Sequence, residues 1–146
     1  MRALLSEDNQ GMRLIIRNLL KPMTTRFVEA LTLADTLKIC REEDFDIALI
    51  DLCLLDATPD ETIAAIPKIV ELSKAPVIVI TGNLEPGIKL RCKEAGAVAF
   101  VQKSETMSVK LSALVLAVKA AVLRNPDTKG KDLLDHVALL ERLVAI

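Results

Sequence analysis

The chain has 146 residues, 51% of them hydrophobic, so it can form one globular domain with its own core but has no room for a second of similar size. Lysine and arginine number 19 against 20 acidic residues, and aromatic residues make up only 2%. Because a basic surface and aromatic platforms for base stacking are both missing, direct binding of nucleic acid is not expected.

The first part of the chain alternates short aliphatic runs with longer segments in which apolar residues recur every three or four positions. Residues 2–6 predict a strand, and residues 12–20 predict a helix that Pro22 ends. Residues 25–30 predict a second, weak strand, followed by a helix at 33–42. This alternation is typical of βαβ units.

The middle of the chain continues the same pattern. The run at 47–50 has no polar face, which predicts a strand buried on both sides at the centre of a parallel sheet. Residues 62–72 predict a helix that Pro67 should bend or break, because proline removes a backbone hydrogen bond. The remaining elements are a buried strand at 77–80, a short helix at 88–94 stopped by Gly96, and a fifth strand at 97–102.

A fifth helix is predicted at about 107–123, so five strands alternate with helices along the chain. This order predicts a doubly wound α/β fold of flavodoxin-like type, with five parallel strands arranged 2-1-3-4-5. The polar stretch 124–131 is interpreted as a linker, and the amphipathic stretch 132–146 as an additional C-terminal helix. The expected organisation is therefore one domain over 1–123, a linker and a terminal helix.

Three cysteines, Cys40, Cys53 and Cys92, stand far apart and form no CxxC pair. This spacing argues against a disulfide framework or a structural zinc site, and it suits a reducing compartment. No apolar run approaches the roughly 18 residues of a membrane span. The N-terminal segment also lacks the long apolar stretch of a signal peptide. We therefore expect a soluble cytoplasmic protein that does not bind membranes.

The candidate functional residues lie where the predicted strands end, because sheets of this type bind ligands beyond the carboxyl ends of their strands. The first strand leads into Glu7 and Asp8, the third into Asp51, the fourth into Thr81 and the fifth into Lys103. Clustered carboxylates repel one another, and Mg²⁺ with oxygen ligands is the usual remedy. Asp51 could then accept a phosphoryl group whose oxygens bind Thr81 and Lys103.

These residues together resemble the response-regulator receiver domains of two-component signalling, over roughly residues 1–123. Four segments carry the resemblance, in the expected order: Ser6-Glu7-Asp8-Asn9, Ile47-Ala48-Leu49-Ile50-Asp51-Leu52, Thr81-Gly82 and Phe100-Val101-Gln102-Lys103. The resemblance implies a signalling domain rather than an enzyme acting on other substrates. A histidine kinase or histidine phosphotransfer protein would phosphorylate Asp51 with Mg²⁺ present, and the phosphorylated domain would change its protein contacts.

The resemblance also implies a role for each matching position. The implied metal ligands are Glu7, Asp8, Asp51 and the backbone carbonyl of Cys53. Thr81 and Lys103 correspond to the residues that bind the phosphoryl group. Phe100 corresponds to the aromatic switch residue, and Cys53 and Asn83 correspond to the variable positions that tune the rate of dephosphorylation.

The sequence departs from the family pattern in two places. Leu55 and Pro59 stand where receivers usually have proline and glycine, so we expect a reshaped loop over 54–60. Ser104 replaces the proline that usually follows the lysine. We expect a trans peptide between Lys103 and Ser104, because a cis bond before a non-proline residue costs about 3 kcal/mol.

Three alternative functions compete with the receiver hypothesis. A degenerate receiver that binds proteins independently of phosphorylation is favoured by Leu55, Pro59 and Ser104, and opposed by the intact Asp51. A phosphatase of the haloacid dehalogenase type would need a second aspartate two residues after Asp51, where this chain has Cys53. A flavin carrier would need a stacking aromatic residue and a glycine-rich phosphate loop after the first strand, and neither is present.

The C-terminal part of the chain predicts the output surface. The predicted helix at 107–123 carries a second apolar stripe beside the one expected to face the sheet, formed by Val109, Leu116, Ala120 and Leu123. The predicted helix at 132–146 carries an apolar stripe of its own, formed by Leu133, Val137, Leu140 and Val144. Both stripes need burial. We therefore expect the two helices to pack together, within one chain or across a homodimer, and to contact a downstream protein.

Overall fold

The computed structural model describes residues 1–83 and 85–103. Within them, five parallel strands form one sheet in the order β2-β1-β3-β4-β5, which confirms the predicted topology. The strands are β1 Arg2–Ser6, β2 Arg26–Ala30, β3 Ile47–Ile50, β4 Val77–Thr81 and β5 Ala99–Gln102. The helices are α1 Gln10–Leu20, α2 Leu33–Glu42, α3 Pro59–Ser73 and α4 Ile88–Ala95, with a short 3₁₀ turn at Lys21–Met23.

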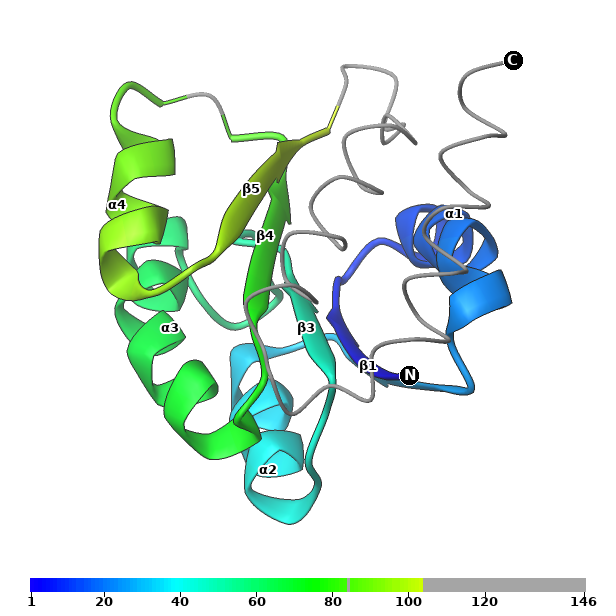
Figure 1. Ribbon diagram of the computed structural model, residues 1–146. Helices are drawn as coiled ribbons and strands as arrows, with labels where there is room; N and C mark the ends of the chain where they lie inside the picture. The colour runs from blue at the N-terminus through cyan, green and yellow to red at the C-terminus, as the bar shows by residue number, and fades with distance from the viewer. Residues whose placement is uncertain (84, 104–146) are drawn as a thin grey trace.

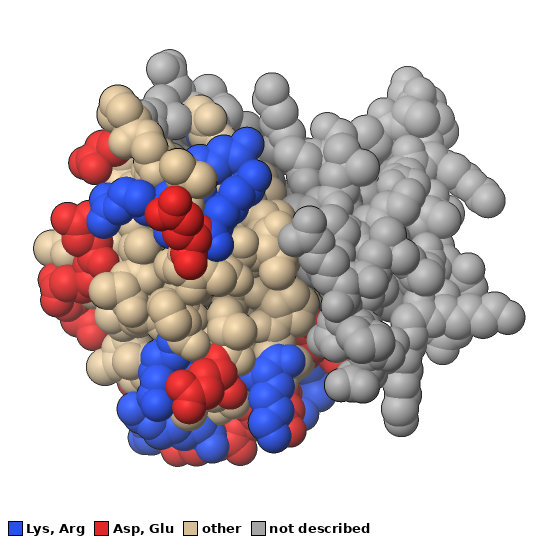
Figure 2. Space-filling model, turned by 60° about the vertical axis from the view of Figure 1, so that its left-hand side comes forward, with Lys and Arg blue, Asp and Glu red and all other residues tan. Residues whose placement is uncertain are grey.

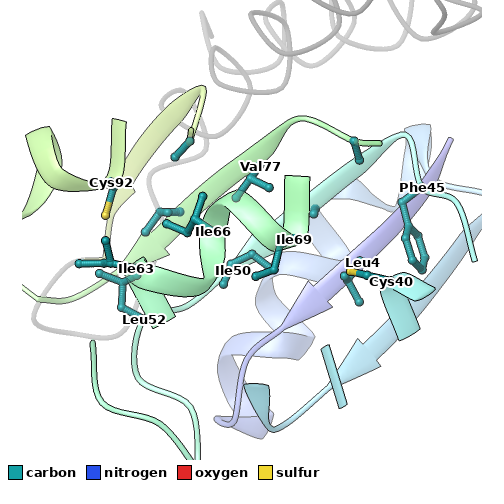
Figure 3. Packing of buried hydrophobic residues seen from close by; sticks show 14 of the residues in the cluster. Leu4, Cys40, Phe45, Ile50, Leu52, Ile63, Ile66, Ile69, Val77 and Cys92 are labelled. Carbon is teal, nitrogen blue, oxygen red and sulfur yellow. The ribbon is translucent and has the colours of Figure 1, made fainter. Parts of the chain in front are cut away.

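Helices cover both faces of the sheet: α2, α3 and α4 lie on one side and α1 on the other (Figure 1). Successive residues of a strand point to opposite faces. Thus Leu5 of β1 and Leu49 of β3 belong to the core under α1, whereas Leu4 and Ile50 belong to the core under the other helices. Figure 3 shows this second core, where Ile66 of α3 lies among the strand side chains.

The outer surface of the helical layer is charged but mixed in sign. Basic and acidic side chains interleave over the side that carries α3 and α4 (Figure 2). Some of them form ion pairs, such as Arg91 of α4 with Asp60 at the start of α3, 2.8 Å apart. Exposed pairs of this kind add little to stability. The buried strands and helix faces are therefore the main source of the fold's stability.

The strand register brings together the carboxyl ends of four neighbouring strands, β1, β3, β4 and β5. Ser6 at the end of β1 pairs with Ile50 at the end of β3, and the Asp51 amide donates to the Ser6 carbonyl at 2.9 Å. On the other side of β4, the Lys103 amide donates to the Thr81 carbonyl at 2.9 Å. The residues that follow these strands therefore emerge along a single edge of the sheet.

Helix α3 begins at Pro59 rather than at the predicted position 62. Thr58 caps it: its hydroxyl accepts from the Glu61 amide at 3.2 Å, and the Glu61 carboxylate accepts from the Thr58 amide at 3.1 Å. This reciprocal pair is a capping box, and proline is favoured directly after the cap because its missing N–H would be unpaired there. The structure thus uses Pro59 to start a helix.

Pro67 does not break this helix, because α3 runs continuously from Pro59 to Ser73. Pro67 lies on the exposed side, while Ile66 and Ile69 next to it are fully buried. The packing of these isoleucines on both sides of the proline outweighs the loss of one backbone hydrogen bond.

Several predicted features lie outside the described residues: the helix at 107–123, the linker at 124–131, the helix at 132–146 and the Lys103–Ser104 peptide bond. They remain predictions. Among the helices that the structure does describe, none combines the length and the apolar character needed to span a bilayer.

We predict that replacing a buried leucine of the central strand β3 by alanine lowers stability strongly, whereas replacing an exposed leucine of α1 does not. Leu49 is completely buried in β3, and Leu14 of α1 is 60% exposed. Leu49→Ala should lower the free energy of unfolding by about 2–5 kcal/mol, because it leaves a cavity in the core. Leu14→Ala should change it by less than about 0.5 kcal/mol. Urea unfolding followed by circular dichroism measures both, and equal losses would contradict this account of the core.

Candidate functional site

A buried cluster of charges occupies the carboxyl edge of the sheet. The Lys103 ammonium nitrogen lies 2.7 Å from Glu7 Oε1 and 2.8 Å from Asp51 Oδ2. The side chains of Lys103, Glu7 and Asp51 are 10%, 1% and 5% exposed. Because buried ions are strongly destabilised unless they are paired, this arrangement holds Lys103 firmly between the two carboxylates.

Asp8 completes a group of three carboxylates. One carboxylate oxygen from each of Glu7, Asp8 and Asp51 lies within 4.8 Å of the others. Glu7 Oε2 is buried and has no hydrogen-bond partner among the residues that the structure describes. Such an oxygen carries a desolvation penalty that a bound cation removes. The donor set therefore fits a hard divalent metal ion.

The loop that carries Glu7 and Asp8 is fixed by Arg13 of α1. Its guanidinium donates to the carbonyl oxygens of Glu7 at 3.0 Å and Asp8 at 3.1 Å, and also lies 3.6 Å from a Glu29 carboxylate oxygen. The Asn9 side chain caps α1 by accepting from the Met12 amide at 2.8 Å. Sequence reasoning missed Arg13, because nothing in its helical position distinguishes it from a surface arginine.

Cys53 contacts Asp51 through its backbone. The Cys53 amide donates to Asp51 Oδ1 at 3.2 Å, so both oxygens of that carboxylate have partners, the second being Lys103. The thiol is exposed, and its pKa is raised by its partial burial and by the neighbouring Asp51 charge. A thiol with a raised pKa is a weak nucleophile, so the backbone of Cys53 matters more to this site than its sulfur.

Thr81, Asn83 and Phe100 lie on the β4 and β5 side of the site. The Thr81 side chain is fully buried, and its hydroxyl oxygen accepts from the Asn83 amide at 3.3 Å. Phe100 is half-buried beside β4 and lines a shallow pocket with residues of α4 and its preceding loop, including Asn83 and Ile88. The structure thus joins Thr81 to Asn83 directly and to Lys103 through the backbone. Asn83 and Phe100 line the same pocket, so Phe100 is linked to Thr81 only through Asn83 in these contacts.

The three buried groups of the cluster titrate together. Burial, followed by contact with Asp51, raises the pKa of Glu7 to about 8. Burial also disfavours the charged form of Asp51, but its contact with Glu7 and its hydrogen bond from Lys103 outweigh burial and lower the Asp51 pKa. Likewise the two carboxylates outweigh burial and raise the Lys103 pKa. Asp51 thus ionises before Glu7, and the Lys103 ammonium holds it in its charged form.

The family model of the response regulator receiver domain matches residues 3–115 of the chain. Among curated relatives, the sensory/regulatory protein RpfC of Xanthomonas campestris is 26% identical over 132 residues, which are 88% of this chain and 18% of RpfC. A candidate transcriptional regulator of Pseudomonas aeruginosa is 31% identical over 122 residues, covering 83% of this chain and 56% of the relative. The chain therefore spans about a fifth of the first relative and about half of the second.

Two solved structures described as receiver domains share the fold. The non-phosphorylated HemR receiver domain from Leptospira biflexa is 25% identical, with a TM-score of 0.69 over 86% of this chain and 97% of that one. A CheY-like receiver domain protein from Methanospirillum hungatei is 20% identical, with a TM-score of 0.68 over 97% of both chains. At that identity the second match shows the fold alone.

We predict that Glu7→Gln removes a pH dependence of stability in the metal-free protein. The pKa of Glu7 in the folded protein is about 8, against an ordinary value of 4.5, so the folded state holds the proton more tightly than the unfolded state. This stabilisation is complete below pH 4.5 and is lost as the pH rises through about 8.

Urea unfolding in EDTA should therefore show wild-type stability falling between about pH 4.5 and about pH 8 by an amount on the order of a few kcal/mol. The fall should be absent or much smaller in Glu7→Gln, whose amide does not titrate. An equal fall in both proteins would mean that another group is responsible.

Proposed function

Because the chain belongs to the family of response regulator receiver domains, we propose that it accepts a phosphoryl group on Asp51 in a Mg²⁺-dependent reaction and thereby switches its contacts with other proteins. The observation that carries the proposal is the buried Lys103 ammonium bound to both Glu7 and Asp51. A structural ion pair needs only one carboxylate. A second buried carboxylate and a third beside it add repulsion that a cation-dependent function explains.

Glu7, Asp8, Asp51 and the Cys53 carbonyl are the proposed ligands of the metal ion. The bound ion would offset the negative charge that gathers as the phosphoryl group approaches the carboxylates. The orphaned Oε2 of Glu7 supports this assignment, because it is a buried acceptor that lacks a partner among the described residues. A cation would compete with the proton for Glu7, because the pKa of that carboxyl is raised to about 8.

Asp51 is the proposed nucleophile. Its lowered pKa keeps it ionised, so a carboxylate oxygen can form a bond to phosphorus while the bond between phosphorus and the donor's leaving group breaks. Lys103 would bind a phosphoryl oxygen from its position beside Asp51. The Thr81 hydroxyl would donate a hydrogen bond to a second phosphoryl oxygen, since its own oxygen already accepts from the Asn83 amide.

The remaining roles are proposed from the same family pattern. Phe100 would be the switch residue that responds when Thr81 binds the phosphoryl group, and its ring lines a pocket beside α4 together with Asn83. Cys53 and Asn83 would tune the lifetime of the phosphorylated state, because both contact site residues through their backbone amides.

Partners and location follow from the proposed activity. The phosphodonor would be a histidine kinase or a histidine phosphotransfer protein, and the output would be a downstream protein or a second copy of this chain. We propose the helices predicted at 107–123 and 132–146 as the output surface. A cytoplasmic location is part of the proposal, and it suits the three free cysteines.

Incubation of the full chain with Mg²⁺ and acetyl phosphate should add the mass of one phosphoryl group, as measured on the intact protein. Asp51→Asn should abolish the addition, as should EDTA. Asp60→Asn is the matched control, because Asp60 is an exposed carboxylate at the start of α3 that pairs with Arg91 instead. It should be labelled like the wild type.

If the wild-type protein stays unmodified under conditions that label an ordinary receiver, phosphotransfer from acetyl phosphate to this chain is excluded. The chain would then act as a receiver fold that binds partners independently of phosphorylation. Labelling of Asp51→Asn at the wild-type level would instead place the acceptor at another residue.

A further inference from the structure

The loop between β3 and α3 is fastened to a distant part of the chain by Asp56. Its Oδ1 accepts from the Leu33 amide at 2.6 Å and its Oδ2 from the Ala34 amide at 3.1 Å. These amides belong to the first turn of α2, where backbone N–H groups have no partner within the helix. One carboxylate therefore satisfies two of them, and the favourable contact with the helix end lowers the pKa of Asp56.

Two further contacts hold the same loop. The Leu55 amide donates to the Leu31 carbonyl at 3.3 Å, which joins the loop to the residues just before α2. Leu54 and Ala57 form an isolated bridge around Asp56, so the turn that presents the carboxylate is closed on itself. Two consecutive loop residues, Leu55 and Asp56, thus attach the loop to the start of α2.

The other end of this loop reaches the phosphoacceptor. Leu52 and Leu54 are buried, and Cys53 between them is exposed and donates its amide to Asp51 Oδ1 at 3.2 Å. The buried leucines fix the loop on its inner side. On its outer side, the described contacts that restrain it are those made by Leu55 and Asp56.

We propose that Asp56 is a positioning residue: its carboxylate ties the β3–α3 loop to the start of α2 and so holds the Cys53 backbone in place beside Asp51. The inference rests on the proposed role of Asp51. A shift of the Cys53 backbone would move the amide that orients Asp51, and also the carbonyl proposed as a metal ligand. Outer residues that orient a metal site commonly change affinity or activity by about 10-fold to 100-fold when they are mutated.

Asp56 does more than cap a helix, because α2 already has a cap of its own. The Thr32 hydroxyl accepts from the Asp35 amide at 3.0 Å, as an N-terminal cap usually does. Asp56 adds acceptors from a different loop. Thr32→Ala is therefore a matched control: it removes a bond from the same helix end but leaves the β3–α3 loop attached.

The experiment compares the full-length wild type with Asp56→Ala, Asp56→Asn and Thr32→Ala. Calorimetric titration with Mg²⁺ and the initial rate of labelling by acetyl phosphate report on the site. Amide exchange by NMR in the metal-free protein reports on the Cys53 and Leu55 amides, and thermal unfolding reports on overall stability.

Asp56→Ala should weaken Mg²⁺ binding and slow labelling by about tenfold, with faster exchange at Cys53 and Leu55. Thr32→Ala should stay within about twofold of wild type in binding and labelling, despite its own loss of stability. Asp56→Asn should keep most of the Mg²⁺ affinity and labelling rate that Asp56→Ala loses, because the asparagine side-chain oxygen can still accept from the Leu33 amide.

The proposal is overturned if Asp56→Ala matches the wild type in binding, labelling and Cys53 exchange. It is also overturned if Thr32→Ala loses as much as Asp56→Ala, since the effect would then come from the stability of α2. Failure of the wild type to be labelled rejects the proposed function instead, and exchange of the Cys53 amide then decides the role of Asp56 by itself.

Discussion

The ammonium of Lys103, held between two buried carboxylates, is the interaction on which the site depends. Glu7 follows β1, Asp51 follows β3 and Lys103 follows β5, so the contact forms only when the strands are in the observed order and register. The surrounding structure fixes each participant from outside the cluster. Arg13 holds the loop of Glu7 through two carbonyl oxygens, and the Cys53 amide holds Asp51. The apolar core thus supports a charged edge that could not persist without it.

Much of this arrangement could be predicted from the sequence, because its signals are local. An apolar run such as 47–50, with no polar face, is expected to form a strand buried on both sides of a parallel sheet. The residues that follow such strands gather at one edge of the sheet. Features that depend on tertiary contacts could not be predicted. The local rule for Pro67 was overridden by the buried isoleucines of α3, and Arg13 and Asp56 resemble ordinary surface residues until the loops they bind are in place.

The chain belongs to the receiver family, and its clustered carboxylates repel one another in the metal-free state. The cation of the proposed function would relieve that repulsion. The curated relatives are longer than the part of them that this chain matches. The chain spans 18% of RpfC and 56% of the Pseudomonas aeruginosa relative, so related receiver sequences occur within longer proteins. In the proposed function, the buried cluster of Glu7, Asp51 and Lys103 carries the chemistry, and the loop fastened by Asp56 positions it.

The central claim is that Asp51 carries the phosphoryl group, and trapping of the acyl phosphate tests it most directly. Borohydride reduces an aspartyl phosphate to homoserine, which marks the modified residue permanently. After treatment with Mg²⁺ and acetyl phosphate, reduction and peptide mapping by mass spectrometry should find homoserine at position 51 and nowhere else, and none when EDTA replaces Mg²⁺. Homoserine at Asp8 or another aspartate, or its absence from every peptide of a sample that gained phosphoryl mass, would contradict the account.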